Sequence, residues 1–431
     1  MKNIHFTINV KAQDCYIYSG YLFIAHEDGS LFYVPLFRVI QILCDRYKQH
    51  EGIIRLAFTR NDYLNNATSS LFLSVPGVRQ SFEAAWNEVA TKCDLSLEWQ
   101  DISDDAKLLN TVQDPILEMK IYGMNLLLGS SKGLFHSNLN IEDDLYHIHP
   151  SKLEKRFDAK VIGLTAKYGC VAISTGKDGL FNLSLFDDSF KIDERPIAPI
   201  SYRTGWSSTD IVNYESKTSF DYLENKVEKN SSMGWVYSKF DEKKEKNRII
   251  QVAEKTYRLE ELNRFSNNRL NNVVYCFNSS ESSFFITNDG IYTTNFMKDK
   301  NKGVYLSSRS RKNTWETKYK FGNPLSAHII PKGCVIEMFD NVLFSRNGVI
   351  EELDSHPAVS VRSYINSIRY RNLVSVVNND YLSIYSVEPF YEPILKYASS
   401  FRYSGINDFD GGVSRNNLIK TDSDGSEVLP F

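Results

Sequence analysis

The sequence predicts an all-β protein built as a β-propeller, a ring of small sheets that are called blades. Three observations predict it: a short phrase recurs along the chain, its copies lie roughly forty to fifty residues apart, and the composition favours strands. The 431 residues include 26 Phe and 25 Tyr, and aromatic side chains suit the pleated, half-buried surface of a sheet. A chain of this length exceeds one ordinary core, which fits a repeat array.

The recurring phrase has the pattern of a β-hairpin. Two clear copies are VAISTGKDGLFNLSLF, from Val171 to Phe186, and FFITNDGIYTTNF, from Phe284 to Phe296. Each has an apolar run, an Asp-Gly turn and a second run, and glycine tolerates the positive φ of tight hairpin turns. Further copies begin at Tyr21, Asn125, Asn341 and Leu373. Because a single hairpin cannot bury both of its faces, stacked copies predict blades of a propeller.

The spacing of the turns predicts the number of blades. Gly133 and Gly179 are 46 residues apart, but intervals of 104 and 111 residues end at Gly133 and Gly290. Each long interval can hold an insertion or another blade. The run TDIVNYESKTSFDYL, from Thr209 to Leu223, has two apolar runs around a polar turn and supplies one more hairpin. We therefore expect seven blades.

The first long interval has a different pattern, which predicts a small α/β insertion at 37–105, after the first hairpin. Apolar residues recur at helical spacing near both ends of this segment, at Val39, Ile40, Leu43 and Tyr47 and at Phe82, Ala85, Trp86, Val89 and Cys93. The second helix is expected to follow the Pro76-Gly77 breaker, with Ser81 as a cap. Between the helices, IIRLAFT and SSLFLSV are expected to be strands.

These patterns divide the chain into four parts. Residues 1–36 form the first blade and a closing strand, 37–105 the insertion, 106–400 the remaining blades and 401–431 a C-terminal tail. The alternating run HFTINV, from His5 to Val10, is expected to pair with the last blade, which removes the open edge of the ring. The tail is polar and ends on Val428, Leu429, Pro430 and Phe431. It is either a frayed end or a docking peptide with an apolar tip.

Two of the repeats resemble a known kind of propeller. The segments NLLLGSSKGLF and VAISTGKDGLF look like the inner-strand phrase of propellers in bacterial sensor proteins. The resemblance covers two of seven repeats and implies the fold, without any residue-level role. Propellers of the tryptophan-aspartate repeat type are a poorer match, because none of the five tryptophans is followed by aspartate.

Charge and composition limit the function classes. The net charge of −3 and the pI near 6.3 give no global field for nucleic acid or anionic lipid. The sequence has no secretory signal pattern and no apolar run long enough to span a membrane, so we expect a cytoplasmic protein. Its six cysteines lack zinc-ligand spacing and read as core thiols. We expect no metal and no cofactor.

Motif searches yield no catalytic residue. Residues 129–133, GSSKG, satisfy the G-x-S-x-G pattern, but a strand pattern follows where a nucleophile elbow needs a helix. His147 and His149 would lie on one face of a strand beside acidic residues, yet two ligands do not make a metal site, and a solvated loop is the simpler interpretation. The repeat itself accounts for the glycines.

The most distinctive charged segment runs from Lys298 to Lys320 and contains eight basic residues and two acidic ones. Basic side chains interleaved with aromatic rings suit single-stranded nucleic acid. An exposed outer strand kept soluble by lysine is the alternative. The candidate contact residues are Lys298, Lys300, Lys302, Arg309, Arg311, Lys312, Trp315, Lys318, Tyr319 and Lys320.

Three function classes fit this sequence. The first is a non-catalytic scaffold or recognition subunit that binds a protein partner through loops, the insertion or the basic segment. The second is a nucleic-acid-binding or sensing subunit that uses the basic segment. The third is an enzyme whose site is assembled at a channel mouth from one polar residue per blade, which leaves no linear motif. The first is the leading hypothesis.

Overall fold

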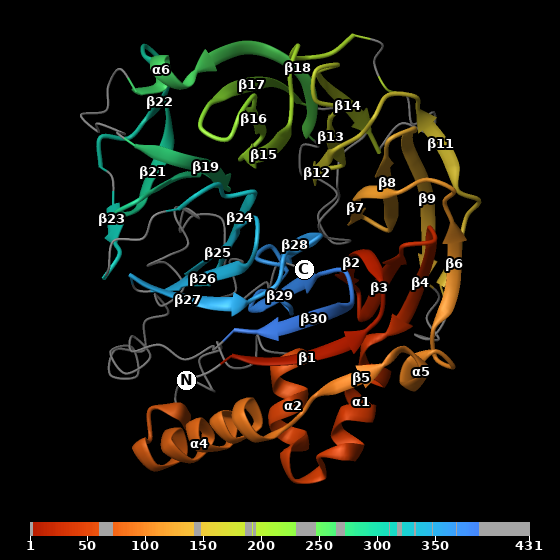
Figure 1. The fold of residues 1–431 in the computed structure, drawn as a ribbon. Helices are drawn as coiled ribbons and strands as arrows, with labels where there is room; N and C mark the ends of the chain where they lie inside the picture. The colour runs from red at the N-terminus through yellow and green to blue at the C-terminus, as the bar shows by residue number, and fades with distance from the viewer. Residues whose placement is uncertain are drawn as a thin grey trace, which may run out of the picture.

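The structure is a closed ring of seven β-sheets with a helical insertion at its outside (Figure 1). In this computed structural model the described residues are 3–59, 72–141, 148–185, 192, 195–229, 247–263, 272–309, 311–316, 321–331, 333–346, 348–367 and 369–387. The predicted tail, 401–431, lies outside them. The chain is an all-β propeller with seven blades, as the spacing of the hairpins predicts.

The blades are sheets of mainly antiparallel strands that we number from the N-terminus, with their strands given from the centre outward. Blade 1 contains β2 (Ala12–Tyr18), β3 (Tyr21–His26), β4 (Ser30–Pro35) and β6 (Lys107–Thr111). Blade 2 contains β7 (Ile116–Tyr122), β8 (Asn125–Ser130), β9 (Gly133–Ile141), β10 (Ile148–Pro150) and β11 (Glu154–Phe157). Blade 3 contains β12 (Gly163–Lys167), β13 (Cys170–Ser174) and β14 (Leu180–Ser184).

Blade 4 contains β15 (Arg203–Ser207), β16 (Asp210–Tyr214), β17 (Phe220–Lys229) and β18 (Asn247–Arg258). Blade 5 contains β19 (Val273–Ser279), β20 (Ser282–Thr287), β21 (Gly290–Asp299), β22 (Gly303–Leu306) and β23 (Arg311–Thr314). Blade 6 contains β24 (Ser326–Ile330), β25 (Gly333–Glu337), β26 (Val342–Arg346) and β27 (Val349–Asp354). Blade 7 contains β28 (Ser360–Ser363), β29 (Leu373–Val377), β30 (Tyr381–Ser386), β1 (Ile4–Asn9) and β5 (Ser96–Glu98). The short helix α6 (Leu259–Leu262) follows β18.

The innermost strands β2, β7, β12, β15, β19, β24 and β28 surround the centre of the ring (Figure 1). They begin at one face of the ring, which we call the entry face. Because successive strands of a blade are antiparallel, the turn between its second and third strands lies at the same face, as does the connection into the next blade. Residues far apart in sequence are therefore brought together at the entry face.

The ring is closed by its first strand, as the alternating run at the N-terminus predicts. β1 pairs antiparallel with β30 of the last blade, from Ile4 opposite Ser386 to Asn9 opposite Tyr381. Its apolar side chains Ile4, Phe6 and Ile8 are fully buried. β1 thus ties the two ends of the repeat array together and removes an open edge from the ring.

The predicted hairpins are present, with one shifted copy. In six blades, including the hairpin of 209–223 in blade 4, the phrase forms the second and third strands. The two segments that resemble the inner-strand phrase of sensor propellers therefore lie one strand out from the centre. The copy from Asn341 forms β26 and β27, the third and fourth strands of blade 6. The equivalent turn in that blade precedes Asn341, and this shift explains the long interval of 58 residues between Gly290 and Gly348.

The insertion leaves blade 1 between β4 and β6 and is mainly helical. It contains α1 (Leu36–Arg46), η1 (Lys48–His50), α2 (Glu51–Phe58), α4 (Pro76–Lys92), β5 and α5 (Trp99–Ile102). The expected strand IIRLAFT is wrong, because these residues belong to α2 and the end of its last turn. Its apolar residues satisfy a buried helix face as well as a strand. The expected strand SSLFLSV lies partly outside the described residues, and its Phe72 and Leu73 are helical.

The second predicted helix starts earlier than expected. Pro76 is the first residue of α4, a position where its missing N–H costs no helical hydrogen bond, so it begins the helix instead of breaking it. Ser81 therefore lies inside the helix and is not its cap. The helices share one hydrophobic core with blades 1 and 7, in which the Phe6 and Phe58 rings meet edge to face at 4.9 Å. β5 pairs parallel with β1 and extends blade 7.

Candidate functional site

A buried carboxylate joins three blades near the entry face. Asp14 is the third residue of the innermost strand β2. Its Oδ1 accepts hydrogen bonds from Ser360 Oγ and from Nε of Arg362 in blade 7, both at 2.8 Å. Its Oδ2 accepts one from the backbone N–H of Met119 in blade 2, at 3.0 Å. With the Cys15 N–H as a further donor, this carboxylate is saturated and acts as a structural link.

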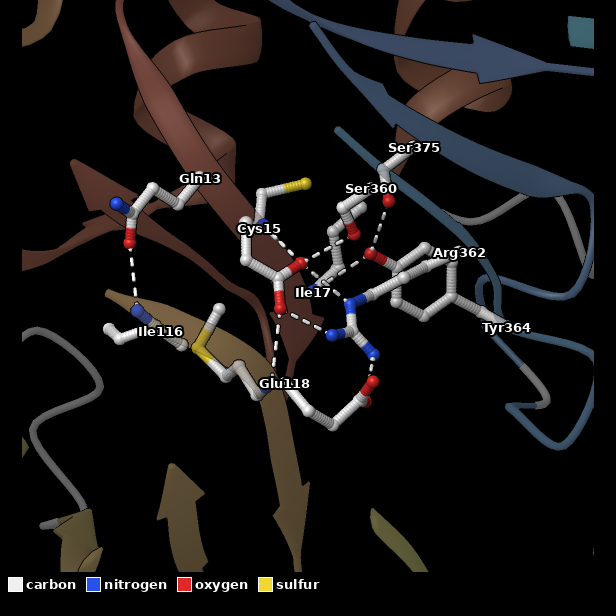
Figure 2. Close-up of polar contacts among 11 residues, drawn as sticks. Gln13, Cys15, Ile17, Ile116, Glu118, Ser360, Arg362, Tyr364 and Ser375 are labelled. Carbon is white, nitrogen blue, oxygen red and sulfur yellow. Dashed lines mark hydrogen bonds and ion pairs between the residues drawn. The ribbon is translucent and has the colours of Figure 1, made fainter. Parts of the chain in front are cut away.

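Arg362 carries the link to a second carboxylate (Figure 2). Its Nη2 donates to Asp14, and its Nη1 lies 2.9 Å from Oε1 of Glu118, on the innermost strand β7. The Arg362 side chain is 13% exposed and that of Asp14 only 3%, so this ion pair is largely removed from water. Burial raises the pKa of Glu118, and the guanidinium of Arg362 opposes that shift. Both carboxylates are thus held by one cation.

Further charged groups lie on other innermost strands. Lys120 on β7 lies over the Tyr16 ring, 5.6 Å from its centroid. Arg203 on β15 stacks between two aromatic rings, those of Tyr214 and Tyr275. The sequence did not single out any of these groups, since they lie on separate strands and only the ring topology brings those strands to the centre.

Histidine 328, on β24, shares this environment. Its Nε2 lies 3.1 Å from Ser326 Oγ. Burial, and then the nearby cations Arg362, Arg203 and Lys120, lower the pKa of His328 to about 4. The imidazole is therefore neutral at physiological pH. The central cluster, which we define as Asp14, Glu118, Lys120, Arg203, His328 and Arg362, draws on five of the seven innermost strands.

The basic segment lies in blade 5, and two of its cations are used within the ring. Lys298 Nζ lies 2.6 Å from Oδ2 of the fully buried Asp210 in blade 4. Lys312 Nζ lies 2.6 Å from the Asp289 carboxylate. These pairs engage two lysines that a nucleic-acid site would need, and the buried carboxylate of Asp210 favours a structural role for Lys298.

The other predicted contact residues fall into three groups, which are buried, exposed or outside the described residues. Trp315 is buried and donates from Nε1 to the Thr287 carbonyl, so its ring packs in the core and is not offered for stacking. The remaining basic residues that the structure describes are exposed, namely Lys300, Lys302, Arg309 and Arg311. Lys318, Tyr319 and Lys320 lie outside the described residues.

Exposed apolar side chains gather at the entry face. Phe339, in the turn between β25 and β26, is 76% exposed, and Leu325, directly before β24, is 40% exposed. Four more large apolar residues with exposed side chains occupy equivalent positions in blades 2, 4 and 7, namely Leu117, Ile200, Tyr202 and Val359. We call these six residues the apolar rim. They lie around the same end of the ring as the central cluster.

A cavity of about 230 Å³ lies between the closing strand and the insertion. His5 and Thr7 of β1 line one side, and Val89 and Ala90 of α4 line the other, together with Cys93, which follows the helix, and residues 94–96. The His5 ring stacks on Tyr385 at 4.9 Å, and burial lowers its pKa. Burial also raises the pKa of Cys93, so the cavity contains a neutral imidazole and an unactivated thiol.

The G-x-S-x-G match is a hairpin turn. Ser131 lies between β8 and β9, and its hydroxyl donates to the Asp114 carboxylate at 3.0 Å. No helix follows it, so the strained elbow that activates such a serine is not formed here. His147 lies outside the described residues. Within the described part of the chain, no group of three potential ligands could hold a metal ion.

Comparisons with known proteins identify no family for this chain. No family model matches it, and no curated protein matches it. Among solved structures, the computationally designed Ika8 protein matches with a TM-score of 0.45 at 6% identity, over 90% of this chain and 100% of the other. The β-propeller domain of Cps50 (Swd1) from Myceliophteria thermophila matches with a TM-score of 0.46 at 8% identity, over 90% and 100%.

A chain of the Mitotic Checkpoint Complex matches with a TM-score of 0.39 at 8% identity, over 89% of this chain and 87% of the other. These scores are low, so the assignment depends on the sheets of the chain itself. In the described ranges no helix is both long enough and apolar enough to cross a membrane. The chain is a seven-bladed β-propeller.

Proposed function

We propose that this protein is a non-catalytic recognition subunit that binds a partner protein through the entry face. The observation that carries the proposal is the apolar rim. Single exposed apolar residues are ordinary on a protein surface, but several at one face mark an interaction site. Large apolar and aromatic side chains also provide most of the energy of protein interfaces.

The arrangement of the rim supports this proposal. Its members come from four blades, at the starts of innermost strands and in one turn between the second and third strands. Leu117 lies on a strand, and the other five lie in the short connections that adjoin strands of the ring, so little conformational entropy is lost when a partner binds. A rigid, broad face built from several blades suits a protein surface better than a small substrate.

The catalytic alternative finds less support in the central cluster. An enzyme needs a carboxylate or histidine free to exchange a proton with substrate. Asp14 instead receives hydrogen bonds from both Arg362 and the backbone of two blades. Glu118 is paired with the same guanidinium. Both carboxylates serve the closure of the ring.

Affinity isolation from the native cell tests the proposal. We would compare the wild-type chain with the double variant Leu325→Asp/Phe339→Asp and with Tyr168→Asp as a matched control. Tyr168 is 38% exposed and lies in a turn at the opposite face. We expect a stoichiometric protein that survives nuclease treatment and that is lost only from the double variant.

Retention of that protein by the double variant would overturn the proposal. Loss of all partners after nuclease treatment would also overturn it and would favour the nucleic-acid alternative. Light scattering of the purified chain tests whether the chain associates with itself. A dimer that the double variant disrupts would show that the partner is a second copy of this chain.

A further inference from the structure

Two cations of the central cluster have no carboxylate partner. Arg203 and Lys120 form no ion pair with any residue that the structure describes, whereas Arg362 holds two carboxylates. Their nitrogen atoms are also absent from the buried, unpartnered polar atoms of the described residues. Apart from the Arg203 nitrogen that donates to the Cys276 carbonyl, these donors are therefore not completely buried, and both residues are half-buried.

Arg203 is held in a fixed orientation. Its guanidinium carbon lies 3.9 Å from the centroid of the Tyr214 ring and 4.2 Å from that of the Tyr275 ring. These contacts with two aromatic rings restrict the guanidinium, and a pre-oriented fork of N–H donors suits a carboxylate or phosphate. The side chain loses little freedom when an anion binds.

His328 lies among the charged groups at the centre of the ring. Its surroundings include the cations Arg362, Arg203 and Lys120 from three other innermost strands. The hydroxyl of Ser326 donates to Glu337 and accepts from His328. The Glu337 carboxylate therefore reaches the imidazole only through this bridging hydroxyl. Asp14 and Glu118 are held by Arg362, so Arg203 and Lys120 act on the imidazole without a paired carboxylate of their own.

We propose that the centre of the ring, beside the entry face, is a binding site for an oxyanion, a carboxylate or a phosphate group, held by Arg203 and Lys120. Planar guanidinium groups bind such anions through paired, charge-assisted hydrogen bonds, and a lysine adds a point charge. This site goes beyond the apolar rim, since its ligand binds the inner strands. The ligand is either a free anion or an acidic group that a partner inserts.

A bound anion would change the protonation of His328. The neutral imidazole is surrounded by cations, so an added negative charge favours its charged form and raises its pKa from about 4. The complex then binds more protons than the free protein. Affinity should therefore rise as the pH falls from 7 towards 5, with proton uptake on binding.

Calorimetric titration of the full chain with sodium sulfate tests this site. Sulfate represents a phosphate group and keeps its charge between pH 5 and pH 7, and sodium acetate at pH 7 represents a carboxylate side chain. The variants are Lys120→Met, Arg203→Lys and the control Lys300→Met, which removes one exposed positive charge in the basic segment. Arg203→Lys keeps the positive charge and removes only the planar set of guanidinium donors. Because the substitution is conservative, a loss of binding is less easily caused by misfolding.

We expect saturable one-site binding that Lys120→Met weakens roughly tenfold or more, the loss of one charge-assisted contact. Arg203→Lys should weaken it similarly, and Lys300→Met should leave it unchanged. Saturation by sulfate alone, by acetate alone or by both supports the site and identifies its anion. No saturable binding of either anion, or equal weakening in the Lys300→Met control, would overturn it. Neither result depends on the apolar rim.

Discussion

Nε of Arg362 on blade 7 donates a 2.8 Å hydrogen bond to Oδ1 of Asp14 on blade 1, across the seam where the first and last blades meet. The two residues are 348 positions apart. The closing strand β1 lies on the outer side of the same seam. The ring is therefore closed twice, by backbone pairing at the outside and by an ion pair at the centre.

The inner closure predicts a large effect of a small change at Asp14. The nearly isosteric variant Asp14→Asn removes one charge and leaves Arg362 in a buried position with Glu118 alone. Breaking a buried pair in this way costs about 3 kcal/mol of unfolding free energy. Urea denaturation measures it. The exposed turn variant Asp178→Asn is the control, and equal stability of the two variants would contradict the proposed link.

The outer closure predicts that Phe6 stabilises the ring and the insertion together. Phe6 is fully buried and contacts Phe58 of α2. Phe6→Ala should cost about 4 kcal/mol, because it removes a large buried side chain and leaves a cavity. Hydrogen exchange should then increase in β30 and in α2 alike. Faster exchange in only one of the two elements would show that they are not coupled through Phe6.

Within the basic segment, substitutions at Lys298 and at Arg309 should differ in their effect on the free energy of unfolding. Lys298→Met leaves the fully buried Asp210 without its cation and should lower the unfolding free energy by about 2 kcal/mol. Arg309 is exposed, so Arg309→Met should change stability by less than about 0.5 kcal/mol. Thermal unfolding measures both variants. If Lys298→Met is neutral and single-stranded DNA binding falls with it, the segment is a binding surface after all.

Two buried histidines predict a loss of stability in mild acid. Burial, with opposing or assisting charges, lowers the pKa of His136 and His328 to about 4, below the value near 6.5 of an unfolded chain. Between these values the unfolded state binds more protons, so stability is complete at pH 7 and falls as the pH drops through 6.5 towards 4. Each histidine should contribute about 2 kcal/mol of that loss between pH 7 and pH 5.

His136→Gln isolates one of the two contributions. The glutamine amide can still donate to Asn125 Oδ1, as His136 Nε2 does at 2.8 Å, but it does not titrate. Urea denaturation at pH 7, 6 and 5 should show a shallower fall in stability than for the wild type. His149→Gln at the exposed surface should keep the wild-type slope. An unchanged slope in His136→Gln would show that this imidazole does not cause the acid sensitivity.

The sequence predicted the ring because hairpin turns carry local signals. Asp-Gly and Asn-Gly turns, the alternation of HFTINV and the hairpin at 209–223 identify strands from neighbouring residues alone. The prediction was wrong where local signals are ambiguous. IIRLAFT fits a helix face as well as a strand, and Pro76 can begin a helix as well as break one.

The central cluster could not be predicted for a different reason. Asp14, Glu118 and Arg362 lie on three different strands, and their proximity depends on how three blades meet. Trp315 shows the reverse case, because its basic neighbours suggest a surface role while its side chain packs in the core. Whether the Trp315 side chain is buried depends on which strands lie beside it, and no local pattern specifies those strands.

Hydrogen exchange of the chain alone and in complex with its native partner tests the central claim most directly. If the entry face is the recognition surface, protection should concentrate in the segments that carry the apolar rim, 112–117, 198–202, 323–326, 338–341 and 355–360. The helices α1, α2 and α4 and the turn at Tyr168 should exchange as in the free protein. Protection confined to the insertion or to the outer strands of blade 5, with the rim segments unchanged, would contradict the account.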